Sequence, residues 1–313
     1  MKSFEISYNK EEGIRGESMG RMKIIVNPQS GREFGLEVVK NLIPLTCADG
    51  WEVILNFTQK RGDGIEFAKK DDCEDLIVCI GGDGTVNEVV NGIYQAKRQV
   101  PLAIIPAGTV NDFGKFLNLP RNAKDFYAMI KRAKICPIDI GVCGERAFIN
   151  VCAGGLFTEI AYSVAESSKS IMGRLAYYLE AVKEVALNLH SKDSFALKLK
   201  SGNTIIQTKA MLFLVANSTS IGGMQNLVPE ADIHDGLLDV LIFEEMQISE
   251  IIELLADIRL GKHSKNPHVM YFKTEEIFIQ SDRELPLDLD GELAGSLPKT
   301  IRIEKNAIKL YMN

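Results

Sequence analysis

From residue 22 to about residue 133, apolar runs alternate with segments whose apolar residues recur at helical spacing. The runs predict strands and the periodic segments predict helices, because side chains repeat every 2 residues along a strand and every 3.6 along a helix. Strands are expected at 22–26, 51–57, 76–80 and 102–105, and helices at 34–43, 64–70 and 84–94. This alternation predicts a parallel α/β domain over residues 22–135, with ligands beyond the carboxyl ends of its strands.

At about residue 136 the pattern changes to short strand-like runs separated by turns. These strands are expected at 138–142, 147–151, 196–200, 205–208, 211–216, 237–243, 269–272, 276–280, 301–304 and 308–311. Periodic segments at 175–189 and 248–258 predict two helices among them. We therefore expect residues 136–313 to form a β-sandwich domain with helical insertions. Its last strand, about 301–313, could return to pack near the first domain, and residues 1–21 form a polar extension.

Composition narrows the class of protein. The 313 residues are 46% hydrophobic and 25% charged, which is ordinary for a soluble globular chain. A net charge of −6 provides no global basic field that would attract nucleic acid. No apolar run reaches the ~18 residues of a membrane-spanning helix, and residues 1–21 lack the apolar core of a signal peptide. We expect a cytoplasmic protein whose membrane contact is peripheral, with its six scattered cysteines reduced.

The most informative segment is 81–88, Gly-Gly-Asp-Gly-Thr-Val-Asn-Glu, between an expected strand and an expected helix. At such a turn, backbone N–H groups and the helix dipole can receive a phosphate, and glycines let it approach closely. Asp83 would repel a phosphate unless Mg²⁺ lies between them. Thr85 and Glu88 have the spacing of a helix capping box. The Walker and dinucleotide-binding patterns are absent, and a simple turn that begins a helix stays an alternative.

Two further loops follow expected strands. Residues 27–32, Asn-Pro-Gln-Ser-Gly-Arg, offer hydroxyl, amide and backbone donors to a phosphate, although this pattern is also a common turn. Residues 106–113 carry Thr109, Asn111 and Asp112, which could contact a nucleotide or cap a helix.

The second domain contains two acidic segments. Asp232, Asp235 and Asp239 surround a Gly turn and suit either Mg²⁺ or a solvated acidic loop. In 288–292, Asp-Leu-Asp-Gly-Glu, the Asp-Gly pair predicts a turn that brings Glu292 to a strand edge.

Taken in order, these five motifs resemble those of the bacterial diacylglycerol kinase-like lipid kinases, whose catalytic domain sphingosine and ceramide kinases share. The resemblance covers roughly residues 22–313 and implies an N-terminal α/β nucleotide-binding domain plus a C-terminal β-sandwich domain. It also implies that a lipid hydroxyl at the membrane surface attacks the γ-phosphate of ATP in the presence of Mg²⁺. Positioning and charge neutralisation would then provide most of the catalysis.

The resemblance further implies roles for individual residues. Glu292 would accept the proton of the lipid hydroxyl, Asp83 would engage the metal or its water shell, and Asp139 would link that region to the acidic loop through water. Mg²⁺ would be held by Asp232, Asp235 and the carbonyl of Leu237. ATP would contact Asn27, Pro28, Gln29, Ser30, Gly31, Thr58, Gly81, Gly82, Asp83, Gly84, Thr85, Val86, Asn87 and Thr109.

Two other functions stay open at this point. Gly-Gly-Asp-Gly-Thr also occurs in NAD kinases, which phosphorylate a soluble substrate, and a non-catalytic nucleotide- or lipid-binding module would keep the fold. The identity of the lipid acceptor and the oligomeric state, a homodimer included, are not fixed by the sequence. The expected helix at 175–189 could be a lipid gate, although such an apolar stripe more often belongs to a core.

Overall fold

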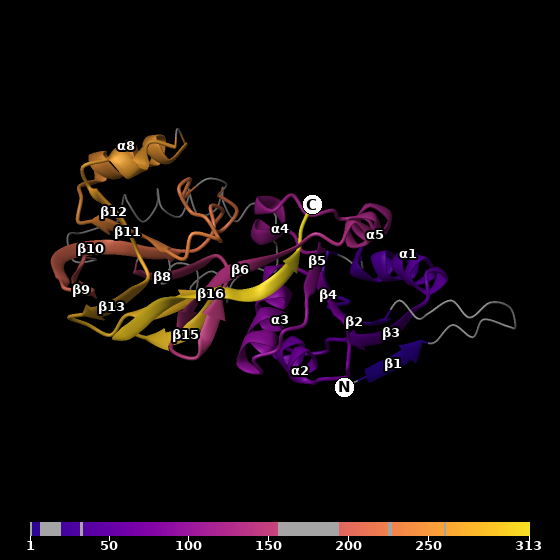
Figure 1. Cartoon of the computed structure of the whole chain (residues 1–313). Coiled ribbons are helices and arrows are strands. Elements are labelled where there is room, and N and C mark those ends of the chain that lie inside the picture. The colour runs from indigo at the N-terminus through magenta and orange to yellow at the C-terminus, as the bar shows by residue number, and fades with distance from the viewer. Residues whose placement is uncertain (1, 7–19, 32–33, 156–193, 225–226, 260) are drawn as a thin grey trace, which may run out of the picture. The chain divides into compact units, whose positions relative to one another are not determined.

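A computed structural model gives the fold (Figure 1) and describes residues 2–6, 20–31, 34–155, 194–224, 227–259 and 261–313. The expected helix at 175–189, Arg32 and most of the extension at 1–21 lie outside these residues. The chain divides into two compact units: unit 1 comprises residues 1–138 and 306–313, and unit 2 comprises residues 139–305.

Unit 1 is built on a parallel sheet. Its strands β2 (Gly20–Val26), β3 (Trp51–Phe57), β4 (Leu76–Gly81) and β5 (Leu102–Pro106) lie in the order β3-β2-β4-β5. At one edge β1 (Lys2–Ile6) pairs antiparallel with β3, and at the other Leu310 of β16 (Lys299–Tyr311) pairs in parallel with Leu102. β4 and β5 are buried along their whole length, as expected for strands covered on both faces.

The helices of unit 1 pack in two pairs. α1 (Phe34–Ala48) contacts α5 (Ala123–Arg132), and α2 (Asp63–Lys69) contacts α3 (Asp83–Gln95). The two pairs cover opposite faces of the sheet in Figure 1, while the short α4 (Asp112–Phe116) follows β5. The register aligns Val26 with Phe57 and Ile80, and Gly81 with Pro106. The carboxyl ends of four strands are therefore level, and the loops that follow them leave from one edge.

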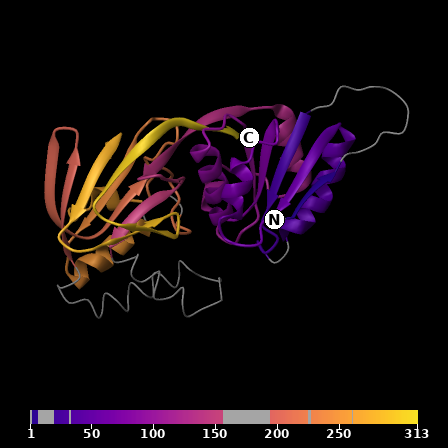
Figure 2. The ribbon, with the colours of Figure 1, turned by 90° about the horizontal axis from the view of Figure 1, so that it is seen from below.

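Unit 2 is a β-sandwich whose two layers share one strand. The first half of β10 (Thr204–Ala216) pairs with β9 (Phe195–Ser201), and its second half pairs with β8 (Val151–Gly155) and β11 (Leu238–Glu244). Its register shifts between Ala210 and Leu212, so the runs expected at 205–208 and 211–216 form one strand that passes from one layer to the other. Figure 2 shows the β9–β10 hairpin in salmon beside the yellow strands of this unit.

The remaining strands extend these two layers. β13 (Glu276–Ser281) joins β9 to the first part of β16, while β12 (Val269–Thr274) borders β11. On the other side of β8 lie β14 (Pro286–Leu289) and β15 (Glu292–Ser296). β6 (Ile135–Cys143) pairs with β7 (Arg146–Phe148) and with β16.

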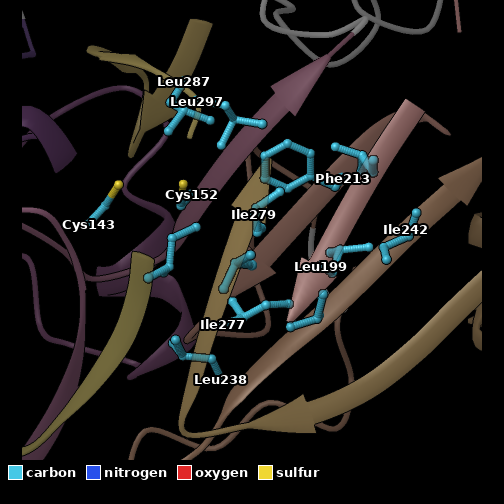
Figure 3. Packing of buried hydrophobic residues seen from close by; sticks show 14 of the residues in the cluster. Cys143, Cys152, Leu199, Phe213, Leu238, Ile242, Ile277, Ile279, Leu287 and Leu297 are labelled. Carbon is cyan, nitrogen blue, oxygen red and sulfur yellow. The ribbon is translucent and has the colours of Figure 1, made fainter. Parts of the chain in front are cut away.

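Apolar side chains fill the space between the layers. Leu199, Ile277 and Ile279 come from one layer, and Phe213 and Leu238 come from the other (Figure 3). A second cluster covers the outer face of β8, β10 and β11, where α8 (Ile248–Arg259) contributes Leu254. This double burial explains why β11 is a nearly continuous apolar run rather than an alternating one.

The prediction of a single strand at 147–151 was wrong. The chain forms β7, leaves the strand conformation at Ile149 and Asn150, and resumes as β8. The carboxylate of Asp290 accepts the N–H groups of residues 149, 150 and 151 at 2.7, 2.9 and 2.9 Å, so these donors do not serve a strand ladder. The six cysteines are free thiols in this structure. No helix in the described ranges is long and apolar enough to cross a bilayer.

Candidate active site

Three loops of unit 1 interlock at the carboxyl edge of the parallel sheet. The side chain of Asn27, in the first loop, donates from Nδ2 to Oγ1 of Thr85 in the second at 3.3 Å. The N–H of Ala107, in the third loop, donates to the carbonyl of Gly81 at 2.8 Å. The N–H of Asn27 also donates to the carbonyl of Ile80 at 3.0 Å. The segments 27–31, 81–87 and 106–111 therefore form one connected surface.

Glycines make this close approach possible. A Cβ on Gly31, whose φ is +59°, would lie 2.3 Å from the carbonyl oxygen of Ala107. A Cβ on Gly108 would lie 2.5 Å from Cα of Gly82, and one on Gly81 would lie 2.5 Å from Cβ of Thr85. Gly84 differs, since a Cβ there would meet no described atom within 4 Å. Packing explains Gly31, Gly81 and Gly108, whereas Gly84 faces open space at the start of α3.

Asp83 belongs to this surface, and its carboxylate reaches the start of α4. Its carboxylate accepts the N–H of Phe113 at 3.3 Å, and it is only partly accessible. Burial raises the pKa of the Asp83 carboxyl, although hydrogen bonds from the backbone of residues 111–113 oppose that shift. A nearby cation would lower the pKa of this carboxyl, because positive charge stabilises the ionised form.

The predicted capping box at Thr85 and Glu88 was wrong. The N-cap of α3 is Gly82, and Oγ1 of Thr85 instead accepts the Asn27 amide. Glu88 accepts the N–H groups of Gly62 and Gly64 at 2.7 and 2.9 Å, so it caps α2 rather than its own helix. Sequence spacing could not reveal this, because α2 precedes α3 in the chain and is separated from it by strand β4.

Asn111 does not cap α4 through its side chain. It has a left-handed conformation with φ of 52°, and its Oδ1 accepts the N–H of Gly108 at 2.8 Å. Its Nδ2 returns a bond to the carbonyl of Gly108 at 2.6 Å. The third loop is thus closed on itself, and the carboxylate of Asp83 serves the N-terminus of α4.

The other candidate nucleotide residues differ in accessibility. Gln29, Gly84 and Thr109 are exposed, and Asn27, Pro28 and Thr58 are partly exposed at the same sheet edge. Val86 and Asn87 are buried within α3, where the amide of Asn91 donates to Oδ1 of Asn87 at 3.0 Å. A ligand at this edge would meet the loop backbones and the exposed side chains rather than these two.

In unit 2, Glu292 begins β15 directly after the turn at Asp290 and Gly291. Both turn residues have positive φ, 52° and 89°, and Leu289 pairs with Glu292, so the predicted Asp-Gly turn is confirmed. The carboxylate of Asp288 accepts the N–H of Gly291 at 2.7 Å. Glu292 is partly buried, and its Oε2 accepts a hydrogen bond from Nη2 of Arg146 at 3.0 Å.

The acidic loop 232–239 is a compact turn with a cation beside it. Nζ of Lys273 lies 2.8 Å from Oδ2 of Asp235 and 3.5 Å from Oδ1 of Asp239. Asp232 is exposed and accepts the N–H of His234 at 3.0 Å, while Asp235 accepts the N–H of Leu237 at 2.9 Å. No cluster of three or more His, Cys, Asp or Glu side chains suited to a metal occurs within the described ranges.

Asp239 is fully buried. Oδ1 accepts the hydroxyl of Tyr271 at 2.6 Å, whereas Oδ2 has no hydrogen-bond partner among the residues that the structure describes. Burial raises the pKa of this carboxyl, and the bond from Tyr271 opposes the rise.

A hydrogen-bonded network that the sequence reasoning missed joins the two acidic segments of unit 2. Asp290 binds the N–H of Asn150, and Oδ1 of Asn150 accepts the hydroxyl of Ser218 at 2.8 Å. Asn217 donates to the carbonyls of Ile149 and Asp139 at 3.2 and 3.1 Å. Oδ2 of Asp139 then accepts the N–H of Gly236 at 2.8 Å.

A signal for this network is present in the sequence. The polar run Asn217-Ser218-Thr219-Ser220 follows directly on the apolar end of β10, and Asn150 interrupts an apolar segment. Polar groups at such positions are buried and need hydrogen-bond partners.

Comparisons with known proteins match both units of the chain. The family model described as diacylglycerol kinase catalytic domain matches residues 21–143, and the model described as YegS C-terminal NAD kinase beta sandwich-like domain matches residues 151–312. A diacylglycerol kinase of Staphylococcus epidermidis is 35% identical over 293 residues, covering 93% of this chain and 92% of that protein. A diacylglycerol kinase of Staphylococcus aureus is 37% identical over 281 residues, covering 89% and 88%.

A solved structure supports the same assignment. The crystal structure of a diacylglycerol kinase from Bacillus anthracis superposes with a TM-score of 0.78 at 26% identity, covering 95% of this chain and 99% of that one. Both units are therefore matched, and the match extends from the Gly-rich loops of unit 1 to the sandwich of unit 2. This chain is a kinase that belongs to the bacterial diacylglycerol kinase-like family of lipid kinases.

Proposed function

We propose that this enzyme transfers the γ-phosphate of ATP to the hydroxyl of diacylglycerol or a related lipid alcohol in a Mg²⁺-dependent reaction at a membrane surface. The observation that carries the proposal is the interlocked set of loops 27–31, 81–87 and 106–111 at the carboxyl edge of the parallel sheet. The relatives matched over nearly their full length carry the name diacylglycerol kinase, which supports the choice of acceptor.

ATP is assigned to unit 1. Exposed Gly84 and the start of α3 offer a backbone surface to a phosphate, and the positive end of that helix favours negative charge. Gln29, Thr58 and Thr109 border the same edge and are assigned to the nucleotide. Asp83 is assigned to the metal or its water shell, since a carboxylate beside a phosphate requires a cation between them.

Glu292 is assigned as the general base. It takes the proton of the lipid hydroxyl as the hydroxyl oxygen bonds to the γ-phosphorus and ADP leaves. The hairpin that carries it is fixed by Asp290 and Asp288, so the carboxylate has a defined place. A fixed base contributes through orientation as well as through proton transfer.

The structural Mg²⁺ that the family implies is assigned to the acidic loop. Carboxylates of Asp232 and Asp235 with the carbonyl of Leu237 form an oxygen-only donor set from one turn, and that chemistry fits Mg²⁺. When bound, the ion supplies positive charge that offsets these carboxylates. Nζ of Lys273 lies 2.8 Å from Oδ2 of Asp235. When the ion binds, Lys273 would either share this carboxylate with it or lose the ion pair.

The test is ATP-dependent phosphate transfer to a panel of acceptors. Diacylglycerol, phosphatidylglycerol and a sphingoid base are presented in mixed micelles, with NAD as a soluble acceptor because one family model mentions NAD kinase. The proposal expects labelled phosphate in a lipid product, at a rate that chelation of Mg²⁺ abolishes. Transfer to NAD with none to any lipid would reject it.

A further inference from the structure

Arg146 makes two directed contacts with the hairpin that carries Glu292. Its Nη2 donates to Oε2 of Glu292 at 3.0 Å, and its Nη1 donates to the backbone carbonyl of Leu293 at 2.8 Å. The guanidinium thus binds a side chain and the main chain of consecutive residues. A planar fork can satisfy both acceptors at once, which a single ammonium cannot do in the same geometry.

The segment that carries Arg146 is itself well fixed. Arg146 pairs with Cys143 in the β6–β7 hairpin, followed by the pairs of Ala147 with Val142 and of Phe148 with Gly141. The aromatic ring of Phe148 fills the space above Gly141, where a Cβ would lie 2.0 Å from it. The register of the strand that carries Arg146 is therefore well defined.

The same segment holds the hairpin at a second place. Three consecutive N–H groups, those of Ile149, Asn150 and Val151, surround the carboxylate of Asp290 at 2.7–2.9 Å. Successive amides of this kind form an anion-binding hollow, and here the anion belongs to the hairpin itself. The N–H of Asp290 returns a bond to the carbonyl of Val151 at 3.0 Å. Residues 146–151 therefore fix both the turn and the side chain that follows it.

We propose that Arg146 is a positioning residue, which holds the Glu292 carboxylate in the orientation that accepts the proton of the lipid hydroxyl. This inference rests on the proposed role of Glu292. In the reaction the O–H bond of the lipid breaks, its oxygen bonds to the γ-phosphorus, and the bridging oxygen leaves with ADP. The proton goes to the carboxylate of Glu292, which the bond from Arg146 to Oε2 holds in place.

A double-mutant cycle tests the inference. Wild-type enzyme, Arg146→Gln, Glu292→Gln and the double variant are compared by single-turnover transfer from ATP to diacylglycerol, and ATP dissociation constants are measured in parallel. Glu292→Gln should lower the transfer rate by about 10²–10⁴. Arg146→Gln should lower it about tenfold with unchanged ATP affinity, and the double variant should be no slower than Glu292→Gln alone.

Two further variants separate positioning from general structure. Arg146→Lys keeps the charge but loses the fork, so it should recover only part of the rate lost in Arg146→Gln. Arg302→Gln is the matched control, because Arg302 forms a similarly exposed ion pair with Glu304 elsewhere in unit 2. Arg302→Gln should transfer phosphate at the wild-type rate. All variants should keep a melting temperature close to that of the wild type, since solvent-accessible ion pairs contribute little to folding.

The outcomes distinguish the two levels of the account. A wild-type rate in Arg146→Gln together with a slow Glu292→Gln overturns the inference and leaves the proposed function in place. Additive losses in the double variant also overturn it, because Arg146 would then act independently of Glu292. A wild-type rate in Glu292→Gln overturns both the inference and the assignment of Glu292 as the base, and it leaves the transfer of phosphate to a lipid in place.

Discussion

At the scale of single residues, the glycines of the three loops 27–31, 81–87 and 106–111 fall into two kinds. Gly31, Gly81 and Gly108 are required by neighbouring protein atoms that lie closer than a Cβ allows. Gly84 has open space around it and no such constraint. A glycine that packing does not require, at the start of a helix and beside a candidate phosphate site, indicates that a ligand approaches the backbone there.

Gly84→Ala should therefore lower ATP affinity by about tenfold, equivalent to ~1.4 kcal/mol, while leaving the fold intact. Alanine also favours a helix over glycine, so the melting temperature should stay level or rise. Gly81→Ala is the matched control, since its methyl group would collide with Thr85 and lower stability. Isothermal titration with ATP and thermal unfolding measure both effects. Unchanged ATP affinity in a folded Gly84→Ala would place the phosphates elsewhere.

Asp83 leads to a prediction about pH. Because burial raises its pKa, the native carboxyl binds a proton more tightly than the unfolded one does. Its contribution to stability is therefore greatest below the ordinary aspartate pKa of about 4 and is lost as pH rises through the raised native value. At neutral pH an ionised Asp83 carboxyl lowers the stability of the native state, and a bound cation would offset that loss.

Asp83→Asn should then unfold at the wild-type temperature or above it at pH 7, and it should lose phosphate transfer. Asparagine can still accept the N–H of Phe113, which alanine cannot, so α4 keeps its cap. Mg²⁺–ATP affinity of the wild type should weaken as pH falls toward the raised pKa, and this dependence should vanish in the variant. Wild-type turnover in Asp83→Asn would contradict the assignment of Asp83 to the metal.

At the scale of elements, a buried ion network supports the amino ends of the parallel strands in unit 1. Nζ of Lys23, on β2, is fully buried and lies 2.7 Å from Glu74 and 3.0 Å from Asp72. Arg98 binds the same carboxylate of Glu74 at 2.7 Å. Burial alone would raise the pKa of Glu74, but the bonds from Arg98 and Lys23 lower it.

Lys23→Met should destabilise unit 1 by about 3 kcal/mol, because it removes one of the two cations that bind the buried carboxylate of Glu74. The control Lys69→Met removes an exposed partner of Glu66 and should cost ~1 kcal/mol or less. Since the native pKa of Glu74 is lowered, its stabilisation is present above the unfolded pKa and is lost as pH falls through the native value. Urea unfolding at several pH values measures this, and equal losses in the two variants would contradict it.

The acidic loop 232–239 gives the second prediction at this scale. If its carboxylates bind Mg²⁺, millimolar Mg²⁺ should raise the melting temperature of the wild type by several degrees, because a ligand of the native state stabilises it. Asp235→Asn should abolish the shift, whereas Glu253→Gln, which removes an exposed carboxylate from α8, should keep it. If the melting temperature of the wild type is the same in Mg²⁺ and in chelator, the loop does not bind Mg²⁺. Lys273 is then the cation that neutralises its carboxylates.

At the scale of the whole molecule, the sequence predicts the fold well because its strands are bounded apolar runs. Leu76–Ile80 and Trp51–Phe57 appear within one residue of the expected limits. Errors arise where a distant side chain intervenes: Asp290 interrupts the strand expected at 147–151, and Glu88 caps α2 instead of α3. Asn150, Asn217 and Arg146 escaped notice because their partners lie far away in the chain.

The central claim is that this lipid kinase uses Glu292 to take the proton of a lipid hydroxyl while ATP is held by separate residues of unit 1. The most direct measurement is single-turnover transfer from labelled ATP to diacylglycerol by Glu292→Gln, with ATP dissociation measured on the same protein. The account predicts transfer slowed by about 10²–10⁴ with unchanged ATP affinity. Transfer at the wild-type rate, or a loss explained entirely by weaker ATP binding, would contradict it.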